Sequence, residues 1–337
     1  MGGDILVTGG LGFLGSAFSR RALSRGANVL IVDLETYAAD PRRLSEASGA
    51  NARTVRLDVA DPAFVDLVRR ERPAVLVHFA AETHVTRGEW SPERFLRSNV
   101  EGTSRMLEAA ETAGVGLVVH ISTDEVYGPC LGSPFREGDK EPGEGRATNA
   151  YARSKALADD VACSFFGRLP VIVVRPTNCF GPWQHPEKAI PRWIIRALLG
   201  EPIPVWGDGE QVRDWMFAED ACDAIETVID RGRPGQVYNV APEGSQRTNM
   251  EIARMVARAA GRGPEDVYLT AYDRPDHDRR YAIAASKLRA LGWMPNAELE
   301  GRLADTVAWY RLHRDWWAPL RGEAESLYAD AAPRGDR

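Results

Sequence analysis

The sequence predicts an α/β fold built on a doubly wound parallel sheet, with a second, smaller mixed α/β lobe. Short β-branched runs alternate with helical patterns through the first half of the chain, as in strand–helix–strand units. Several of these runs are apolar throughout, which is typical of parallel strands that are covered on both faces. A glycine-rich turn joins the first strand to the first helix.

The expected strands of the first half are Ile5–Thr8, Asn28–Val32, Thr54–Leu57, Val75–Phe79, Leu117–Ser122 and Val171–Val174. Helical patterns between them cover Leu14–Arg25, Pro62–Arg70, Pro92–Ala113 and Tyr151–Phe166. This alternation places helices on both faces of the sheet.

The alternation ends near Arg175, where closely spaced prolines predict irregular loops around one helix, Ile190–Leu199. A further strand is expected at Gln236–Val240. Thr248 and Glu251 have the spacing of a capping box and predict a helix that runs toward Ala260.

The composition excludes several classes of protein. The net charge of −6 argues mildly against general affinity for nucleic acid or anionic membranes. No apolar run is long enough to span a membrane, so we expect a cytoplasmic protein. The four cysteines form no Cys-x-x-Cys pair, which argues against a metal site or a disulfide framework; they are Cys130, Cys163, Cys179 and Cys222.

The glycine-rich turn has the spacing Gly-x-x-Gly-x-x-Gly at Gly9, Gly12 and Gly15. One glycine permits the tight turn, one permits close approach of a phosphate, and one permits the helix to pack on the strand. A glycine triplet alone also fits an ordinary tight turn, but its place between strand and helix favours a Rossmann dinucleotide site.

Asp33 ends the second strand, 18 residues after Gly15. A carboxylate there can accept hydrogen bonds from both ribose hydroxyls and would repel a 2′-phosphate, which predicts NAD rather than NADP. Asp58, at the end of the third strand, could similarly face the adenine amino group. The alternative for either residue is an ordinary loop aspartate.

Tyr151 and Lys155 have the spacing that puts both side chains on one face of a helix. A free tyrosine has a pKa of about 10 and is a poor base at neutral pH. A nearby ammonium and a positively charged nicotinamide both favour the phenolate. Tyr151 could then accept a hydroxyl proton while the carbon of that alcohol gives hydride to NAD. The alternative is a surface tyrosine and lysine.

Asp124 and Glu125 follow the fifth strand in the run Ser122 to Gly128, with Thr123 beside them as a hydrogen-bonding partner. Neighbouring strand residues point to opposite faces, so both acids reach one substrate only if the chain turns there. Tyr127-Gly128-Pro129 permits such a turn. Two carboxyls with separated pKa values would provide an acid and a base, which predicts elimination of water after the oxidation. The alternative is a solvated strand end.

These residues resemble the extended short-chain dehydrogenase/reductase family, and within it the dTDP-glucose 4,6-dehydratases, from Ile5 to about Leu320. The stretches that carry the resemblance are Val32 to Ala38, His78 to Val85, Ser122 to Gly128, Tyr151 to Lys155, Gly181 to Lys188, Gly207 to Trp215 and Asp273 to Tyr281. The resemblance implies that Tyr151 and Lys155 act at C4 of a hexose. It further implies that Glu125 is the base at C5 and Asp124 the acid at C6, and that hydride returns to C6.

The resemblance also implies the binding residues. Those for NAD are Gly9, Gly12, Phe13, Leu14, Gly15, Asp33, Thr36, Asp58, Val59, Ala80, Ala81, Thr83, Asn99, Tyr151 and Lys155. Those for the nucleotide-sugar, most simply dTDP-glucose, are Thr83, Asn178, Lys188, Pro204, Trp206, Arg213, Asn249, Arg274 and His277. The helices Pro92–Ala113 and Tyr151–Phe166 would form the interface of a homodimer.

Three departures from the family pattern leave the sugar and the base open. Thr86 and Gly88 stand where the family has aspartate and serine, Cys179 stands where a second asparagine is usual, and Trp206 replaces a tyrosine. A UDP-linked or non-glucose sugar stays possible.

The competing activities are a UDP-glucuronate-type decarboxylase or a 4-epimerase, which lack the Asp-Glu pair. A catalytically silent NAD-binding regulator is the third, although such proteins generally lose the tyrosine or the lysine.

The expected domain organisation follows. Residues 1–175 form the NAD-binding domain, to which segments near 210–240 and 281–292 return. Residues 176–321 form a discontinuous sugar-nucleotide lobe. Residues 322–337 are polar and lack periodicity, which predicts a loose tail.

Overall fold

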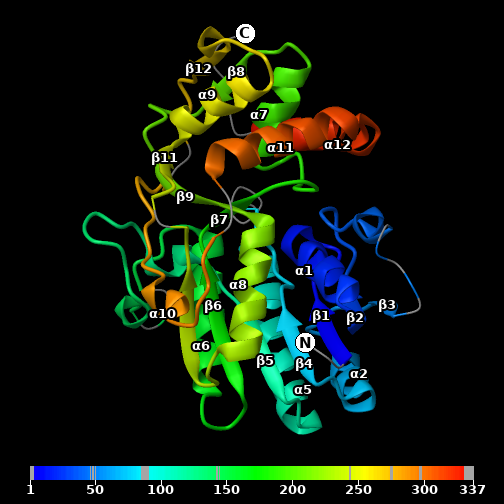
Figure 1. Cartoon of the computed structure of the whole chain (residues 1–337). Coiled ribbons are helices and arrows are strands. Elements are labelled where there is room, and N and C mark those ends of the chain that lie inside the picture. Colours follow the sequence, from blue (N-terminus) through cyan, green and yellow to red (C-terminus); the bar gives the residue numbers. More distant parts are fainter. Residues whose placement is uncertain are drawn as a thin grey trace.

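The computed structural model describes residues 4–45, 47, 49, 51–84, 91–141, 143, 145–242, 244–273, 276–295 and 298–329. A large layered part that contains the main sheet lies below a smaller lobe in the view of Figure 1. Among the described residues, no helix has both the length and the apolar character that crossing a membrane requires.

Seven parallel strands form the main sheet in the order β10-β6-β5-β4-β1-β2-β3. Their bounds are β1 Asp4–Thr8, β2 Asn28–Asp33, β3 Ala52–Arg56, β4 Val75–His78, β5 Leu117–Ile121, β6 Val171–Pro176 and β10 Gln236–Val240. The chain builds outward from β1 to β3 and then resumes at β4 on the other side of β1. Strand order therefore reverses between β1 and β4, where open α/β sheets bind ligands at the carboxyl ends of their strands.

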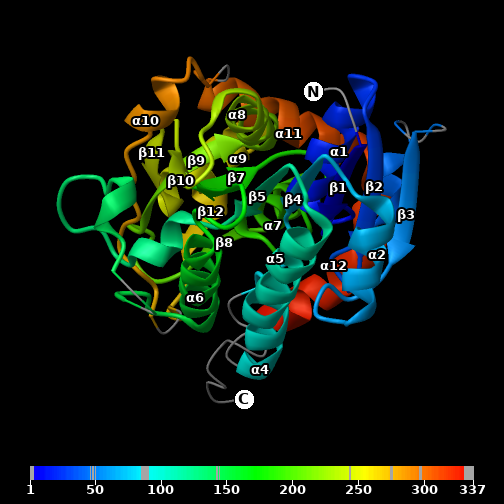
Figure 2. The ribbon, with the colours of Figure 1, turned by 90° about the horizontal axis from the view of Figure 1, so that it is seen from below.

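Helices cover both faces of this sheet (Figure 2). One face carries α1 Phe13–Ser24 and α8 Ala218–Arg231, which pack against each other. The other carries α2 Ala63–Glu71, α5 Gly102–Ala113 and α6 Ala150–Ser164. Because side chains alternate along a strand, Val7 packs in the core under the first group and Leu6 in the core under the second.

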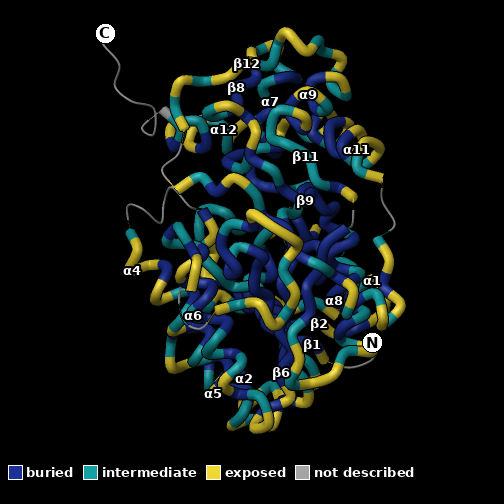
Figure 3. The backbone as a smooth tube through the Cα atoms, turned by 90° about the vertical axis from the view of Figure 1, so that its left-hand side faces the viewer, coloured by how far each residue is buried: buried dark blue, intermediate teal, exposed yellow. Residues whose placement is uncertain are grey.

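The smaller lobe has its own sheets and core. A three-stranded sheet has the order β11-β9-β7, and β12 pairs with β8. The bounds are β7 Asn178–Phe180, β8 Ile203–Val205, β9 Val212–Phe217, β11 Gln246–Thr248 and β12 Val267–Leu269. Four helices pack around them: α7 Ala189–Leu198, α9 Asn249–Ala259, α11 Leu299–Leu312 and α12 Arg314–Ala329. Their contacts bury an aromatic-rich core, and Figure 3 shows buried backbone segments within this lobe.

Several short elements complete the fold. They are the helices α4 Pro92–Phe95 and α10 Ser286–Arg289, the π-helix η2 Leu96–Glu101, and the 3-10 helices η1 Pro41–Leu44, η3 Asp124–Tyr127, η4 Glu137–Asp139 and η5 Pro264–Asp266. The predicted continuous helix Pro92–Ala113 is thus α4, a π-helical turn and α5.

The fold class is confirmed, and each predicted strand occurs within two residues of its expected ends. The capping box of α9 is confirmed as well, because Thr248 Oγ1 accepts from Glu251 N and the Glu251 carboxylate accepts from Thr248 N. The domain division stays a prediction. Of the segments expected to return to the first domain, β10 is a strand of the large sheet and α8 packs against that sheet, whereas β9 belongs to the three-stranded sheet.

The predicted loose tail is wrong for residues 322–329. This segment completes α12, where Ala324 and Leu327 are buried and Glu325 pairs with Arg192. Pro319 and Gly322 concealed the helical pattern, because both residues are usually unfavourable inside a helix. Residues 330–337 lie outside the described part of the chain.

One buried ion pair joins the main sheet to α6. Arg175 on β6 donates two hydrogen bonds to Asp159 at 2.6 and 3.0 Å, with both side chains at most 3% exposed. Asp159→Ala would leave an uncompensated buried guanidinium, so we expect a loss of about 3–5 kcal/mol in the free energy of unfolding. Urea denaturation measures this loss. The matched control is Glu300→Ala, which breaks an exposed pair with Arg258 and should cost at most about 1 kcal/mol. Equal losses in the two variants would contradict the expectation.

Candidate active site

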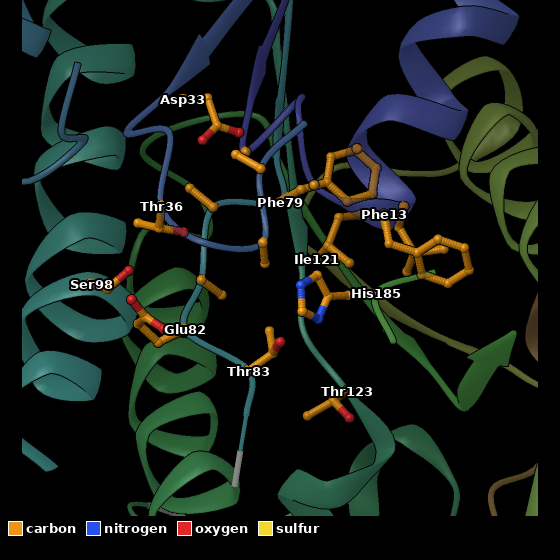
Figure 4. A pocket seen from close by; sticks show the side chains of 18 of the residues that line it. Phe13, Asp33, Thr36, Phe79, Glu82, Thr83, Ser98, Ile121, Thr123 and His185 are labelled. Atoms are coloured by element: carbon orange, nitrogen blue, oxygen red, sulfur yellow. The ribbon is translucent and has the colours of Figure 1, made fainter. Parts of the chain in front are cut away.

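A cavity of about 500 Å³ opens at the point where strand order reverses. Its walls come from the carboxyl ends of β1, β2, β4, β5 and β6, from α6, and from the segment that leads into α7. Figure 4 shows Asp33 and Thr36 toward one end, Thr123 toward the other, and Thr83 and His185 between them. This length suits an elongated ligand.

The glycine turn forms the wall beside β1. Gly9 has φ +67°, and a Cβ on Gly9 would lie 2.6 Å from Ala80 N. A Cβ on Gly15 would lie 2.2 Å from the Gly9 carbonyl oxygen. The backbone therefore fills the space that side chains would need. The N-cap residue of α1 is Gly12, which has no side chain to bond the first amides of the helix, so these amides suit a pyrophosphate.

Asp33 is fixed at the end of β2 by two backbone amides. Its Oδ2 accepts from Leu11 N at 2.9 Å and its Oδ1 from Glu35 N at 2.8 Å. Burial raises the pKa of Asp33, and the two amide bonds oppose that effect. Each oxygen retains a lone pair for a further donor, so the residue fits a ribose diol.

The other predicted NAD residues surround the same cavity, with one exception. The lining includes Phe13, Leu14, Thr36, Asp58, Val59, Ala80, Ala81 and Thr83. Asn99 does not line it. From η2, the Asn99 side chain accepts from Glu82 N at 2.8 Å and donates to Ser154 Oγ at 2.8 Å. Asn99 thus lies behind the cavity wall and holds Glu82, the lining residue next to Thr83, in place.

Arg43 lines the cavity and was missed by the sequence prediction. It donates to the carbonyls of Leu11 and Ala38, each at 2.6 Å, and to that of Trp183 at 3.1 Å. Burial lowers its pKa to about 10. The residue ties the glycine turn to the lobe through backbone carbonyls, a contact for which no sequence motif exists.

Tyr151 and Lys155 lie on α6, whose first turn is capped by Asn149. Lys155 Nζ donates to the Ile121 carbonyl at 2.7 Å, and burial lowers its pKa to about 8. Burial and then Glu125 raise the pKa of Tyr151, against the effect of a hydrogen bond with Thr123. The chain's own groups therefore favour the neutral phenol of Tyr151. We had expected the Lys155 ammonium to favour the phenolate. A bound nicotinamide would supply a positive charge that favours the phenolate of Tyr151.

The two acids lie in η3, where the chain turns directly after β5. Thr123 caps this turn, and Gly128 ends it with φ +74°. Glu125 lines the cavity and accepts from Asn149 Nδ2 at 3.2 Å and from Tyr281 Oη at 3.4 Å. The turn thus brings Glu125 to the cavity that Tyr151 also lines.

Asp124 is 2% exposed and lies directly behind the wall that Thr123 and Thr177 line. Its Oδ1 is 3.2 Å from Thr123 Oγ1 and its Oδ2 is 3.0 Å from Thr177 Oγ1. Burial, and then repulsion by Glu125, raises its pKa to about 7. Neither acid faces bulk solvent in the way that a solvated strand end would, and Asp124 has the pKa of a proton donor at neutral pH.

The predicted substrate residues form two groups. Thr83, Asn178 and Lys188 line the cavity, where Lys188 Nζ donates to the Thr83 carbonyl at 3.0 Å. The buried Oδ1 of Asn178 has no hydrogen-bond partner among the described residues, so it is available to a ligand.

The second group does not line this cavity; it comprises Pro204, Trp206, Arg213, Asn249 and His277. Trp206 packs edge-on against Tyr272, and the neighbouring Asp273 binds His277 Nδ1 at 2.6 Å. Arg213 lies 4.2 Å from the ring of Tyr281, whose hydroxyl reaches Glu125. Arg274, like the departures Thr86 and Gly88, lies outside the described residues.

The cavity also contains residues that the prediction omitted, among them Ser122, Thr177, His185 and Glu187. His185 and Glu187 belong to the Gly181 to Lys188 stretch, so the resemblance held a signal for them. Thr177 had none, because its importance comes from contacts with residues distant in sequence.

The fold and this site define an NAD-binding α/β enzyme. The model of the NAD dependent epimerase/dehydratase family matches residues 5–241, and the chain belongs to this family. The predicted family and cofactor are thereby confirmed, and the glycine turn and Asp33 fit NAD.

Similar proteins agree over most of the chain. A dTDP-glucose 4,6-dehydratase from Streptomyces niveus is 41% identical over 333 residues, which cover 96% of this chain and 97% of the relative. One from Xanthomonas campestris pv. campestris (strain B100) is 41% identical over 92% of this chain and 94% of its own. The solved structure of the dTDP-glucose 4,6-dehydratase DesIV from Streptomyces venezuelae, with NAD bound, is 38% identical. Its TM-score is 0.87, and the match covers 94% of this chain and 99% of that one.

The close approach of Gly15 to the Gly9 carbonyl predicts that a side chain at position 15 weakens cofactor binding. Gly15→Ala would force a Cβ against the Gly9 carbonyl, so the turn must open. We expect NAD affinity to fall by at least about tenfold, or about 1.4 kcal/mol, in isothermal titration calorimetry. The matched control is Gly322→Ala on α12, where a Cβ meets open space. Unchanged affinity in Gly15→Ala would refute the assignment of this turn to the pyrophosphate.

Asp124 makes the stability of the chain depend on pH. Its pKa rises from 3.8 to about 7 on folding, so between these values the folded state holds a proton that the unfolded state has released. The free energy of unfolding therefore falls as pH rises from about 4 to about 7. Asp124→Asn should remove this dependence. We expect the variant to match the wild type at pH 4 and to be more stable at pH 8 by up to about 4 kcal/mol. Urea denaturation across this pH range measures the difference; a constant difference would contradict the expectation.

Proposed function

We propose that the chain is an NAD-dependent sugar-nucleotide 4,6-dehydratase that converts dTDP-glucose to dTDP-4-keto-6-deoxyglucose. The observation that carries this proposal is the placement of Asp124 and Glu125 in one turn beside Tyr151. Asp124 is enclosed and has its pKa raised to about 7, whereas Glu125 lines the cavity. The names of the dTDP-glucose 4,6-dehydratase relatives support the same reaction.

The reaction begins with proton removal by Tyr151. A bound NAD would supply the hydride acceptor for C4 and the hydride that returns to C6. Tyr151 takes the proton of the C4 hydroxyl, and Thr123 shares the hydrogen bonds of that oxygen. Lys155, held by the Ile121 carbonyl, keeps a positive charge on the helix face that carries Tyr151.

Elimination follows because the C4 ketone makes the C5 hydrogen acidic. Glu125 takes the C5 proton, the new double bond forms between C5 and C6, and the C6 hydroxyl leaves. Asp124 gives its proton to this oxygen, which departs as water. The base must be charged and the acid neutral at the same pH, and their different environments provide this.

The remaining predicted residues would hold the substrate. Lys188 and Arg213 suit the diphosphate, because both are cations and arginine can bind phosphate through two donors. Asn178 and Asn249 would assist them, and Thr83 would contact the sugar. Pro204 and Trp206 would border the base, on which an aromatic ring can stack, and Arg274 and His277 would close over the nucleotide.

A UDP-linked glucose is the second candidate substrate. An Arabidopsis thaliana protein whose name includes UDP-glucose 4,6-dehydratase is 34% identical over 95% of this chain, although the match covers 49% of that larger protein. The solved structure of MoeE5 with UDP-glucose and NAD is 30% identical, with a TM-score of 0.81, over 92% of this chain and 99% of its own.

We further propose a cytoplasmic homodimer. Its interface would involve α5 and α6, which pack on one face of the sheet. Leu96, at the start of the π-helical turn before α5, is 48% exposed and would be covered there. The analogy with the family supports this arrangement.

The proposal predicts a specific product. Purified protein with NAD should convert dTDP-glucose, and UDP-glucose more slowly, to a product lighter by one water. That product absorbs in alkali as a 4-keto-6-deoxy sugar. A decarboxylase would instead release carbon dioxide from a glucuronate, and an epimerase would give a product of unchanged mass.

Variants separate the steps. Tyr151→Phe should abolish turnover with the fold retained, which would also exclude a silent regulator. Asp124→Asn and Glu125→Gln should lower kcat by about 10²–10⁴ while C4 oxidation continues and NADH accumulates. Glu300→Ala is the control and should keep full activity. Elimination at the wild-type rate in both acid variants would overturn the assignment.

A further inference from the structure

Thr177 occupies the junction between the main sheet and the smaller lobe. It lies between β6 and β7, and its backbone amide donates to the Val240 carbonyl at 3.0 Å. The side chain is 4% exposed and lines the cavity. Its hydroxyl meets two oxygens, the Asp214 backbone carbonyl at 2.9 Å and Asp124 Oδ2 at 3.0 Å.

The number of protons decides which way these bonds run. A threonine hydroxyl has one proton to donate and two lone pairs that accept. A backbone carbonyl only accepts, so the Asp214 contact is a hydrogen bond when Thr177 gives its proton there. A lone pair of Thr177 then faces Asp124 Oδ2, and two lone pairs at 3.0 Å would repel each other. Both contacts can therefore be hydrogen bonds at the same time only if Asp124 Oδ2 carries a proton.

We propose that Thr177 is a positioning residue that holds Asp124 as a neutral acid with its proton on Oδ2. This inference rests on the proposed function, in which Asp124 is the acid. The carboxylate form of Asp124 could receive the Thr177 proton only after the bond to the Asp214 carbonyl is broken. The neutral acid keeps both bonds, so Thr177 favours it.

The charged groups around Asp124 act in both directions. Glu125 in η3 and Asp214 on β9 favour the neutral acid, whereas Arg213 on β9, and a hydrogen bond that Thr177 donates, favour the carboxylate. Tyr151 on α6 and Cys179 on β7 also face Asp124, and burial raises the pKa of each. Burial and Glu125 together raise the pKa of Asp124 to about 7. The Asp214 carboxylate accepts from Ser245 and Gln246, each at 3.2 Å. Thr177 instead contacts the backbone carbonyl of Asp214.

This arrangement stores the proton that dehydration consumes. Thr123 and Thr177 separate Asp124 from the cavity, and the carboxyl has almost no contact with solvent. In the resting site this proton points at Thr177 Oγ1 and not into the cavity, so the bond between Asp124 and Thr177 must open before the proton is given away. The Asp124 O–H bond then breaks and a new O–H bond forms on the leaving C6 oxygen, which releases water and leaves the carboxylate.

The test measures the protonation of Asp124 without turnover. The carboxylic acid C=O stretch of Asp124 is identified in infrared spectra by its loss in Asp124→Asn, and its intensity is followed against pH. Thr177→Val removes the acceptor at nearly constant volume. We expect the midpoint to fall by about one pH unit, the scale of one hydrogen bond. Thr177→Ser keeps the hydroxyl and should restore the wild-type midpoint. An unchanged or raised midpoint in Thr177→Val would overturn the proposal, because a raised midpoint means that Thr177 donates to a carboxylate.

A control variant and a second method complete this test. Ser245→Ala removes a hydroxyl from the Asp214 side chain but leaves the Asp214 carbonyl, and it should not move the midpoint. If Thr177→Val does not fold, neutron diffraction of the wild type below pH 7 locates the deuteron. A deuteron bonded to Asp124 Oδ2 supports the proposal, and a Thr177 deuteron directed at Oδ2 refutes it. Because neither readout needs the reaction, failure of this inference differs from failure of the proposed function, which the product assay reports.

Discussion

The carboxyl end of β5 is the point on which the rest of the site depends. β5 pairs with β4 and β6 in the middle of the sheet, so its last residue has little freedom. The Ile121 carbonyl there holds Lys155, and the next residues turn into η3 with both acids. A strand that continued straight would have sent Asp124 and Glu125 to opposite faces. The turn instead keeps one acid in the cavity and the other directly behind its wall.

The smaller lobe closes this region from the other side. β7 begins two residues after β6 ends, and its neighbour β9 brings Arg213 and Asp214 toward Asp124. The chain then leaves β9 directly into α8, which packs against α1 on the main sheet. The lobe is therefore held to the sheet at both ends of its short strands. This explains how residues more than fifty positions apart can form hydrogen bonds whose direction depends on a single proton.

The sequence predicted those features that arise from local pattern, and the structure explains why it missed others. The apolar strands, the Gly9 turn and the Tyr151/Lys155 spacing each depend on neighbours a few residues away, and each was recognised. α8 was missed because its stretch, Ala218–Arg231, follows a proline-rich region and alternates acids with alanines. Asn99 was expected at the cofactor, but a π-helical turn directs its side chain toward Ser154 instead. Arg43 and Thr177 act through carbonyls of distant residues, and no spacing in a sequence encodes such contacts.

The electrostatics of the site favour protonated groups wherever the chain acts alone. Burial and Glu125 raise the pKa of both Asp124 and Tyr151, and burial lowers that of Lys155 to about 8. In a poorly solvated wall each ionisation lacks water to stabilise it, so only a nearby opposite charge can drive it. In the proposed reaction a bound nicotinamide would supply that charge for Tyr151. For Asp124 no cation forms an ion pair among the described residues, so its surroundings favour the protonated acid that the proposed reaction needs. The same burial thus disfavours ionisation of both groups, whereas in the proposed reaction the order of oxidation before elimination follows from the acidity that a C4 ketone gives the C5 hydrogen.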